Sequence, residues 1–180
     1  RFGVTGYVDL TPHIAWSLRA KANAFDPGAF VAEWPGRLNF DLASAGSLPE
    51  AGPQGTLVLS NLRGRLRNRD IGGRADLKLA SNKTLTGDLD LTSGRSRVQL
   101  EAERGSKLDA VANINVPALD DWLPNAGGSL QGRIAVQGLW PDWHVSGELD
   151  GEALQYTTTR AQTIEAQWNI DRPLEPSGNL

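Results

Sequence analysis

The chain has 180 residues, with 18 Lys and Arg against 21 Asp and Glu, and it contains neither Cys nor Met. The net charge of −3 argues against a nucleic-acid-binding protein, which carries a basic excess. Without Cys there can be no disulfide, thiol nucleophile, zinc–thiolate site or iron–sulfur cluster. The length suffices for one domain, and no apolar run approaches the roughly 18 residues that span a membrane. Because the chain lacks a starting Met, we expect it to be a piece of a longer protein.

Alternation of apolar and polar residues dominates the chain. Leu85, Leu89 and Leu91, for example, alternate with polar residues. A period of two predicts strands that have one dry face and one wet face. In chain order the predicted strands are 2–10, 14–24, 38–42, 55–59, 75–79, 85–92, 98–103, 108–116, 130–136, 145–149 and 164–171.

Short polar or glycine-containing stretches separate the strands. Those at 71–73, 81–83, 93–94 and 104–106 are typical of hairpin turns. Strands joined by such tight turns predict a long antiparallel meander, so the expected fold class is all-β.

Two segments break the alternation, and each precedes a strand. The first, 26–34, begins with Asp26 in a capping position and Pro27 at the first helical position. The second, 117–123, ends at Pro124. We expect one or two helical turns in each.

The same order of elements occurs twice, 92 residues apart. The matching pairs are Gly36 and Gly128, Leu38 and Leu130, Leu42 and Ile134, Gly46 and Gly138, Leu48-Pro49 and Trp140-Pro141, Gly55 and Gly147, Leu57 and Leu149, and Leu62 and Leu154. We predict that residues 1–180 form one continuous domain, with a first repeat unit at 26–116 and a partial second unit at 117–180. The parent protein is then expected to be an array of such units.

These stretches resemble the TamB family, which belongs to the AsmA-like group of Gram-negative envelope proteins. The resemblance lies in residues 25–40, 116–132 and 136–147 and covers most of the chain. It implies a long sheet curled lengthwise into an open apolar groove, called a β-taco. It also implies a periplasmic protein anchored in the inner membrane by an N-terminal helix.

The resemblance further implies a function. Members of the family are implicated in moving phospholipids towards the outer membrane. They are also linked to outer-membrane protein assembly and protein secretion through an outer-membrane β-barrel partner, TamA. Contacts with that partner are expected to lie in parts of the family outside this chain.

Physical reasoning from the residues also favours a groove. A dozen strands about 4.8 Å apart make a sheet near 60 Å long, and the sequence has no amphipathic helix long enough to cover its apolar face. Acyl chains suit such a face because each buried CH₂ gains about 0.8 kcal/mol. The residues predicted to line the groove are Leu38, Phe40, Leu42, Leu77, Leu79, Leu89, Leu91, Leu100, Ala110, Ala112, Ile114, Ile134, Val136, Leu149, Ile164 and Trp168. Small inward residues, among them Gly132 and Gly147, are expected to leave width for a ligand.

Several alternatives stay open at this point. The apolar stripe could be the packed core of a closed sandwich or barrel that acts as a spacer. The chain could also be a scaffold that receives strands of outer-membrane clients by β-augmentation. The arginines at 63, 65, 67 and 69, expected on one strand face, could meet lipid phosphates or form a solvated outer face. The latter interpretation is preferred.

The tryptophans divide into two groups. Trp34, Trp122, Trp140 and Trp143 lie beside Pro and are predicted to close the groove ends and hold the short helices. Trp16 and Trp168 fall on apolar strand faces.

Catalytic candidates are few. His13 and His144 lack the spacing of metal ligands, and Asp120 and Asp121 are interpreted as charges at a helix start. Asp88 and Asp90 fit an exposed strand face in the same way. The sequence has no Walker loop, dinucleotide fingerprint, nucleophile elbow or His-Glu-x-x-His motif. We therefore predict no enzyme, no cofactor and no metal site, and a passive mechanism.

Overall fold

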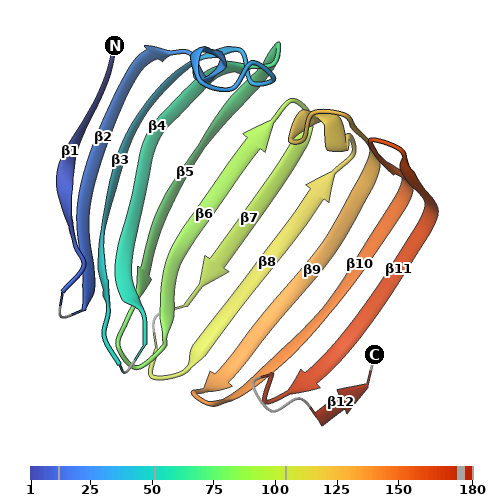
Figure 1. Ribbon diagram of the computed structural model, residues 1–180. Helices are drawn as coiled ribbons and strands as arrows, with labels where there is room; N and C mark the ends of the chain where they lie inside the picture. The colour runs from blue at the N-terminus through green and yellow to red at the C-terminus, as the bar shows by residue number, and fades with distance from the viewer. Residues whose placement is uncertain (12, 51, 104, 174–176, 180) are drawn as a thin grey trace.

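The computed structural model describes residues 1–11, 13–50, 52–103, 105–173 and 177–179. The segments of alternating apolar and polar residues form the strands of one continuous sheet. The strands pair antiparallel in chain order, β1 to β12, with β1 and β12 at the two edges (Figure 1). Their bounds are β1 (Phe2–Asp9), β2 (Ile14–Phe25), β3 (Gly36–Leu48), β4 (Gln54–Leu66), β5 (Arg69–Leu79), β6 (Leu85–Ser93), β7 (Ser96–Ala102), β8 (Leu108–Val116), β9 (Ala126–Leu139), β10 (Asp142–Tyr156), β11 (Thr159–Asp171) and β12 (Ser177–Asn179). The predicted all-β meander, curled into an open groove, is confirmed.

Several strands are longer than the alternation predicted. Each predicted strand lies largely within one of β1 to β11, but β4 and β10 extend well past the predicted ends. Register shifts interrupt the pairing of β2 with β3, β3 with β4, β4 with β5 and β9 with β10. A β-bulge inserts an unpaired residue and increases the local twist. These bulges break the strict alternation in the sequence, and they help the sheet to curl.

One predicted turn is wrong. β5 runs without interruption through Gly72 and Gly73, and the chain reverses instead at Arg67 and Asn68. These two residues have φ values of 51° and 63°. A two-residue hairpin with both residues left-handed matches the twist of its strands, and Asn tolerates that conformation well. The turns predicted at 81–83 and 93–94 are correct. The turn predicted at 104–106 includes residue 104, which lies outside the described residues.

The two predicted helical segments are single 3₁₀ turns, η1 (Pro27–Ala29) and η2 (Leu119–Asp121). As expected, Asp26 caps η1, where its side chain accepts a hydrogen bond of 2.9 Å from the Gly28 amide. Both turns lie along the same side of the sheet, where β2 and β8 end (top in Figure 1). We call this edge of the sheet, formed by the ends of the strands rather than by either face, the upper rim.

Candidate functional site

The register of the strands collects the apolar side chains on one face of the sheet. A single row crosses eleven strands, with each residue directly opposite the next. It consists of Val4, Ala20, Leu42, Leu59, Ala75, Leu89, Leu100, Ala112, Ile134, Gly147 and Trp168. Every strand from β1 to β11 thus contributes an apolar residue or glycine, and we call this side of the sheet the apolar face.

All the residues predicted to line a groove lie on this face. They come from β3 (Leu38, Phe40, Leu42), β5 (Leu77, Leu79), β6 (Leu89, Leu91), β7 (Leu100), β8 (Ala110, Ala112, Ile114), β9 (Ile134, Val136), β10 (Leu149) and β11 (Ile164, Trp168). The prediction omitted residues of the same face on β1, β2 and β4, such as Val4, Ala20 and Leu57. The same period of two would have found them.

In the part of the chain that the structure describes, no second sheet or layer of helices packs over the apolar face. The molecule exposes 11,627 Å², whereas a compact monomer of 19.4 kDa exposes about 8,500 Å². In the row, Leu42, Leu59, Leu89, Leu100 and Ile134 are half-buried rather than buried. Within the described residues, the elements in close contact are sheet neighbours, β6 with β8, and the 3₁₀ turns with β3 and β9. The apolar face is therefore accessible to solvent or to a ligand.

The opposite face is polar. One of its rows consists of Arg74, Asp90, Gln99, Asn113, Arg133, Glu148 and Gln167. Ion pairs cross neighbouring strands there, from Arg74 to Asp88 at 3.2 Å and from Arg97 to Asp90. A hollow of 670 Å³ beside Arg133, Glu148 and Gln167 lies on this polar side and does not belong to the apolar face.

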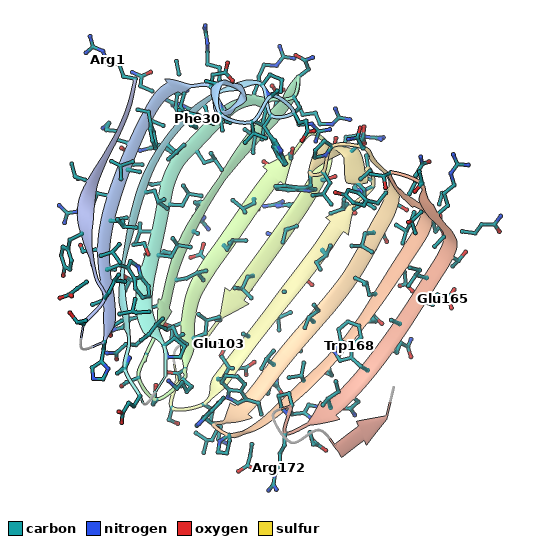
Figure 2. All side chains as sticks on the ribbon, viewed as in Figure 1. Arg1, Phe30, Glu103, Glu165, Trp168 and Arg172 are labelled. Carbon is teal, nitrogen blue, oxygen red and sulfur yellow. The ribbon has the colours of Figure 1, made fainter. Side chains whose placement is uncertain are left out.

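Two tryptophans lie flat on the apolar face. Trp168 on β11 (labelled in Figure 2) stands directly opposite Gly147. Trp16 stands directly opposite Gly46. A β-carbon at either glycine would collide with the indole ring. The expectation that Gly147 leaves width for a ligand is therefore wrong, because the Trp168 ring fills the space.

Leu149 fills the space at Gly132 in the same way. A β-carbon there would lie 2.8 Å from the Leu149 side chain. The glycines thus admit their neighbours' side chains and do not widen the groove.

Aromatic side chains gather at both ends of the strands. At the lower ends, Trp143 packs against the buried cluster of Ala102, Leu108 and Ala110, and its ring centroid lies 5.0 Å from that of Trp140. At the upper rim, the Arg67 guanidinium lies 5.6 Å from the centre of the Trp34 ring.

A second group at the upper rim consists of phenylalanines. Phe25 lies within 6.4 Å of Phe2, Phe30 and Phe40, measured between ring centroids. Phe30 is 77% exposed. The apolar face therefore continues to the rim at this end of the sheet.

The predicted row of arginines is divided between the two faces. Arg65 pairs with Asp70 on the polar face, at 3.5 Å. Arg69 stands opposite Leu66 and so belongs to the apolar side, because the turn at 67–68 separates the two strands. The prediction of one common face is wrong for Arg69.

Arg69 instead binds two carboxylates of η2. Its guanidinium donates to Asp120 and Asp121. The sequence placed both aspartates correctly at a helix start but did not reveal this partner, which lies about fifty positions away in the chain. No local pattern signals a contact over that separation.

Asp121 is the most completely bonded carboxylate of the rim. It is 8% exposed, and it accepts hydrogen bonds from Arg69, from the Ser96 hydroxyl at 2.8 Å and from the Arg95 amide at 3.0 Å. Burial alone would raise the pKa of Asp121, but these bonds outweigh it and hold the pKa below its ordinary value. The carboxylate is therefore charged at neutral pH.

Other titratable groups offer little chemistry. His144 Nδ1 lies 2.7 Å from Asp171 Oδ1, across β10 and β11. Among the described residues, His, Asp and Glu form no group of three that could hold a metal ion. The described residues contain no helix that is long and apolar enough to cross a membrane.

Comparison with known proteins completes the description. A family model described as the TamB N-terminal domain matches residues 1–180. The translocation and assembly module subunit TamB of Haemophilus influenzae is 26% identical over 124 residues, which are 68% of this chain and 10% of that protein. The chain therefore spans a small part of that relative. No solved structure matches it.

Proposed function

Because the chain belongs to the TamB family, we propose that it forms part of a periplasmic conduit for phospholipid acyl chains between the inner and outer membranes. The observation that carries this proposal is the uncovered apolar row, which continues without a polar residue from Val4 on β1 to Trp168 on β11. Eleven strands about 4.8 Å apart give the row a length of roughly 48 Å. An apolar surface of this extent needs a partner of the same chemistry.

The proposed mechanism is passive sliding along the row. An acyl chain on the apolar face gains about 0.8 kcal/mol for each CH₂ removed from water and needs no polar partner. Since successive strands offer similar apolar surface, the chain can move from one strand to the next without a large change in free energy. The head group remains in water at the rim. Direction has to come from elsewhere in the parent protein.

The name of one relative supports a proposal about the setting of this segment. The Haemophilus protein is a subunit of a translocation and assembly module by name. We propose that the present chain serves such a module in outer-membrane biogenesis, in the periplasm, within a parent protein anchored in the inner membrane. A TamA-like outer-membrane β-barrel is the proposed partner, through parts of the parent protein outside this chain.

A second candidate function is supported by the edge of the sheet. Among the described strands, β1 pairs with β2 alone, and all eight of its residues are exposed. An exposed edge offers backbone groups to an incoming strand. In this alternative, client segments of outer-membrane proteins would add to β1, and the chain would act as an assembly scaffold.

The proposed repeat of 26–116 and 117–180 has support of its own. The residues that end η1 and η2, Phe30 and Trp122, are 92 positions apart and have nearly the same φ and ψ angles. A hydrogen bond of 2.7 Å from the Arg67 amide to Pro35 O has a counterpart 90 positions further on, of 3.1 Å from the Thr157 amide to Asn125 O. If both halves are copies of one unit, an array of units would lengthen the same groove.

Photo-crosslinking on β8 tests the conduit. Ile114 points to the apolar face, and its chain neighbour Asn113 points to the polar face. With a photoreactive amino acid at position 114, irradiation in phospholipid vesicles should yield lipid adducts detected by mass spectrometry. The same residue at position 113 is the matched control and should yield none.

The two candidate functions give different results. Equal yields at 113 and 114, or no lipid at either in a folded chain, would contradict the conduit. Protein adducts formed by a probe at position 4 on β1, together with no lipid at 114, would favour the scaffold.

A further inference from the structure

The segment between β8 and β9 makes a detour across strands that are not its neighbours in the sheet. We call residues 117–125 the strap; it includes η2. Ser93 on β6 donates a hydrogen bond of 2.6 Å to the Asp121 carbonyl oxygen. The single hydroxyl hydrogen of Ser96 on β7 is shared between Asp121 Oδ2 at 2.8 Å and the Ala118 carbonyl oxygen at 3.2 Å. Arg69 on β5 binds the carboxylates of Asp120 and Asp121. The strap therefore joins β5, β6 and β7 to β8 and β9.

The strap lies on the apolar side of the sheet. Ser93 continues the alternation of Leu89 and Leu91 on β6 and stands opposite Ile71. Ser93 and Ser96 are each 1% exposed. Their hydroxyls are polar groups on a mainly apolar face, and their bonds to the strap satisfy them.

The turn beneath the strap is shaped to receive it. Gly94 has a φ of 56°. A β-carbon there would lie 2.5 Å from Asp121 Oδ1, so a larger residue would displace the carboxylate. Asp121 is thus buried, paired with Arg69 and in close contact with Gly94. We call the bonds between Asp121 and Arg69 the latch.

A tie of this kind has a mechanical consequence. In a meander, each strand is bonded to its two neighbours, so the curl of the sheet accumulates from small rotations at every strand pair. The latch connects the start of β5 with the connection that follows β8, three strands further on. It therefore limits how far the intervening strands can flatten or close.

The carboxylate at the other 3₁₀ turn, Asp26, caps the start of that turn and has a local role. Asp26 accepts from the Gly28 amide at 2.9 Å and from the Gly36 amide at 2.8 Å, both within the connection from β2 to β3. These bonds hold the connection itself and do not reach across strands. The two turns thus differ in function although they share one rim.

We propose that the latch is a brace that sets the curl of β5 to β9, and thereby the width of the apolar groove, with Asp121 and Arg69 as its positioning residues. Any consequence for acyl chains rests on the proposed function, whereas the consequence for the shape of the sheet does not.

Spin labelling tests the brace without lipid. The chain has no Cys, so cysteines introduced at Asp76 on β5 and Gln131 on β9 can be labelled specifically. Both side chains are exposed on the polar face, away from the latch. Pulsed electron resonance on the full chain then gives the distribution of distances between the two labels. Asp121→Asn should broaden this distribution, because the strap loses its charge pair.

The matched control is Asp90→Asn. Asp90 also pairs with an arginine, Arg97, but on the polar face and between adjacent strands. Its loss should leave the distribution as in the unmodified chain. Arg69→Gln should broaden it as Asp121→Asn does, and the double variant should add nothing further.

Each outcome decides the proposal. A folded Asp121→Asn chain with an unchanged distribution would overturn it, as would equal broadening by Asp90→Asn. If Asp121→Asn does not fold, Ser96→Ala removes one bond to Asp121 and should broaden the distribution more mildly. Lipid crosslinking at position 114 is measured separately, so failure of the conduit and failure of the brace are distinguishable.

Discussion

Individual residues decide where this open sheet is held together. Most apolar side chains on the apolar face are half-buried and so contribute less than core residues do. Three of the five buried polar side chains among the described residues lie at the upper rim, where Ser93 and Ser96 donate hydrogen bonds to Asp121. The other two, Lys83 and Thr84, lie in the turn between β5 and β6. A carboxylate buried among donors is costly to disturb, because its loss leaves those donors unpaired. Asp121 therefore contributes more to the stability of the sheet than its position in a connecting segment indicates.

The stability of the chain should depend on pH through Asp121. Its pKa is lower in the folded than in the unfolded chain, so its contribution is complete at neutral pH and is lost as pH falls through the folded value. The charged groups that face it are Arg69 on β5 and Asp120 beside it, and the Arg95 amide completes the site. Asp121→Asn should lower the free energy of unfolding at pH 7 by about 1.5–3 kcal/mol.

Urea denaturation across pH measures this effect. The gap between Asp121→Asn and the unmodified chain should persist from pH 7 to about pH 4 and narrow below that. Asp90→Asn, which removes an ion pair of the more exposed polar face, should produce a smaller gap. A gap for Asp121→Asn that stayed constant far into acid would show that the carboxylate's charge is not what stabilises the rim.

At the scale of elements, each strand has two faces with different tolerance. In a closed core, a charged residue on the inner face would be buried and the strand could not form. On an open sheet, the same charge remains hydrated. β4 offers a direct comparison, since Leu57 points to the apolar face and its neighbour Thr56 to the polar face.

Leu57→Glu should leave the chain folded and impair lipid capture. The expected loss of stability is at most about 1.5 kcal/mol, the transfer free energy of a partly exposed side chain. Lipid crosslinking at position 114 should fall, because a carboxylate interrupts the apolar surface. Thr56→Glu is the matched control and should change neither quantity. A Leu57→Glu chain that fails to fold would mean that the face is packed in solution.

At the scale of the whole molecule, the sheet does not close. β1 and β12 are separate edges, and the surface exceeds that of a compact monomer by roughly 3,000 Å². Figure 1 shows the strands turning in direction from β1 to β11 while both edges stay free. An open, curled sheet has a larger radius of gyration than a compact protein of the same length, because its atoms lie further from its centre of mass.

Small-angle X-ray scattering tests this shape. A compact chain of 180 residues has a radius of gyration of about 16 Å. We expect a clearly larger value for the monomer, measured at several concentrations because the free edges favour association. A value near 16 Å in dilute solution would mean that the sheet folds onto itself and hides the apolar face.

The strands themselves could be predicted from sequence, and so could the composition of the apolar face. A period of two is a local property, and all the predicted lining residues, from Leu38 to Trp168, fall on one face. The antiparallel order β1 to β11 was also predicted, because most connections are short and favour pairing of consecutive strands. The capped turn at Asp26 was equally local, since the capping residue lies two positions from its partner.

The tertiary structure alone decided how the faces are used. The turn at Arg67 and Asn68, two residues long, turns Arg69 to the apolar side and makes it available to Asp121. The Trp168 ring occupies the space that Gly147 seemed to leave. Each of these contacts depends on register between separate strands, which the bulges shift by single residues. The alternation in the sequence therefore determined which residues share the apolar face. The register of the folded strands determined which of them come into contact, how the strap is bonded at the upper rim, and that the face stays open.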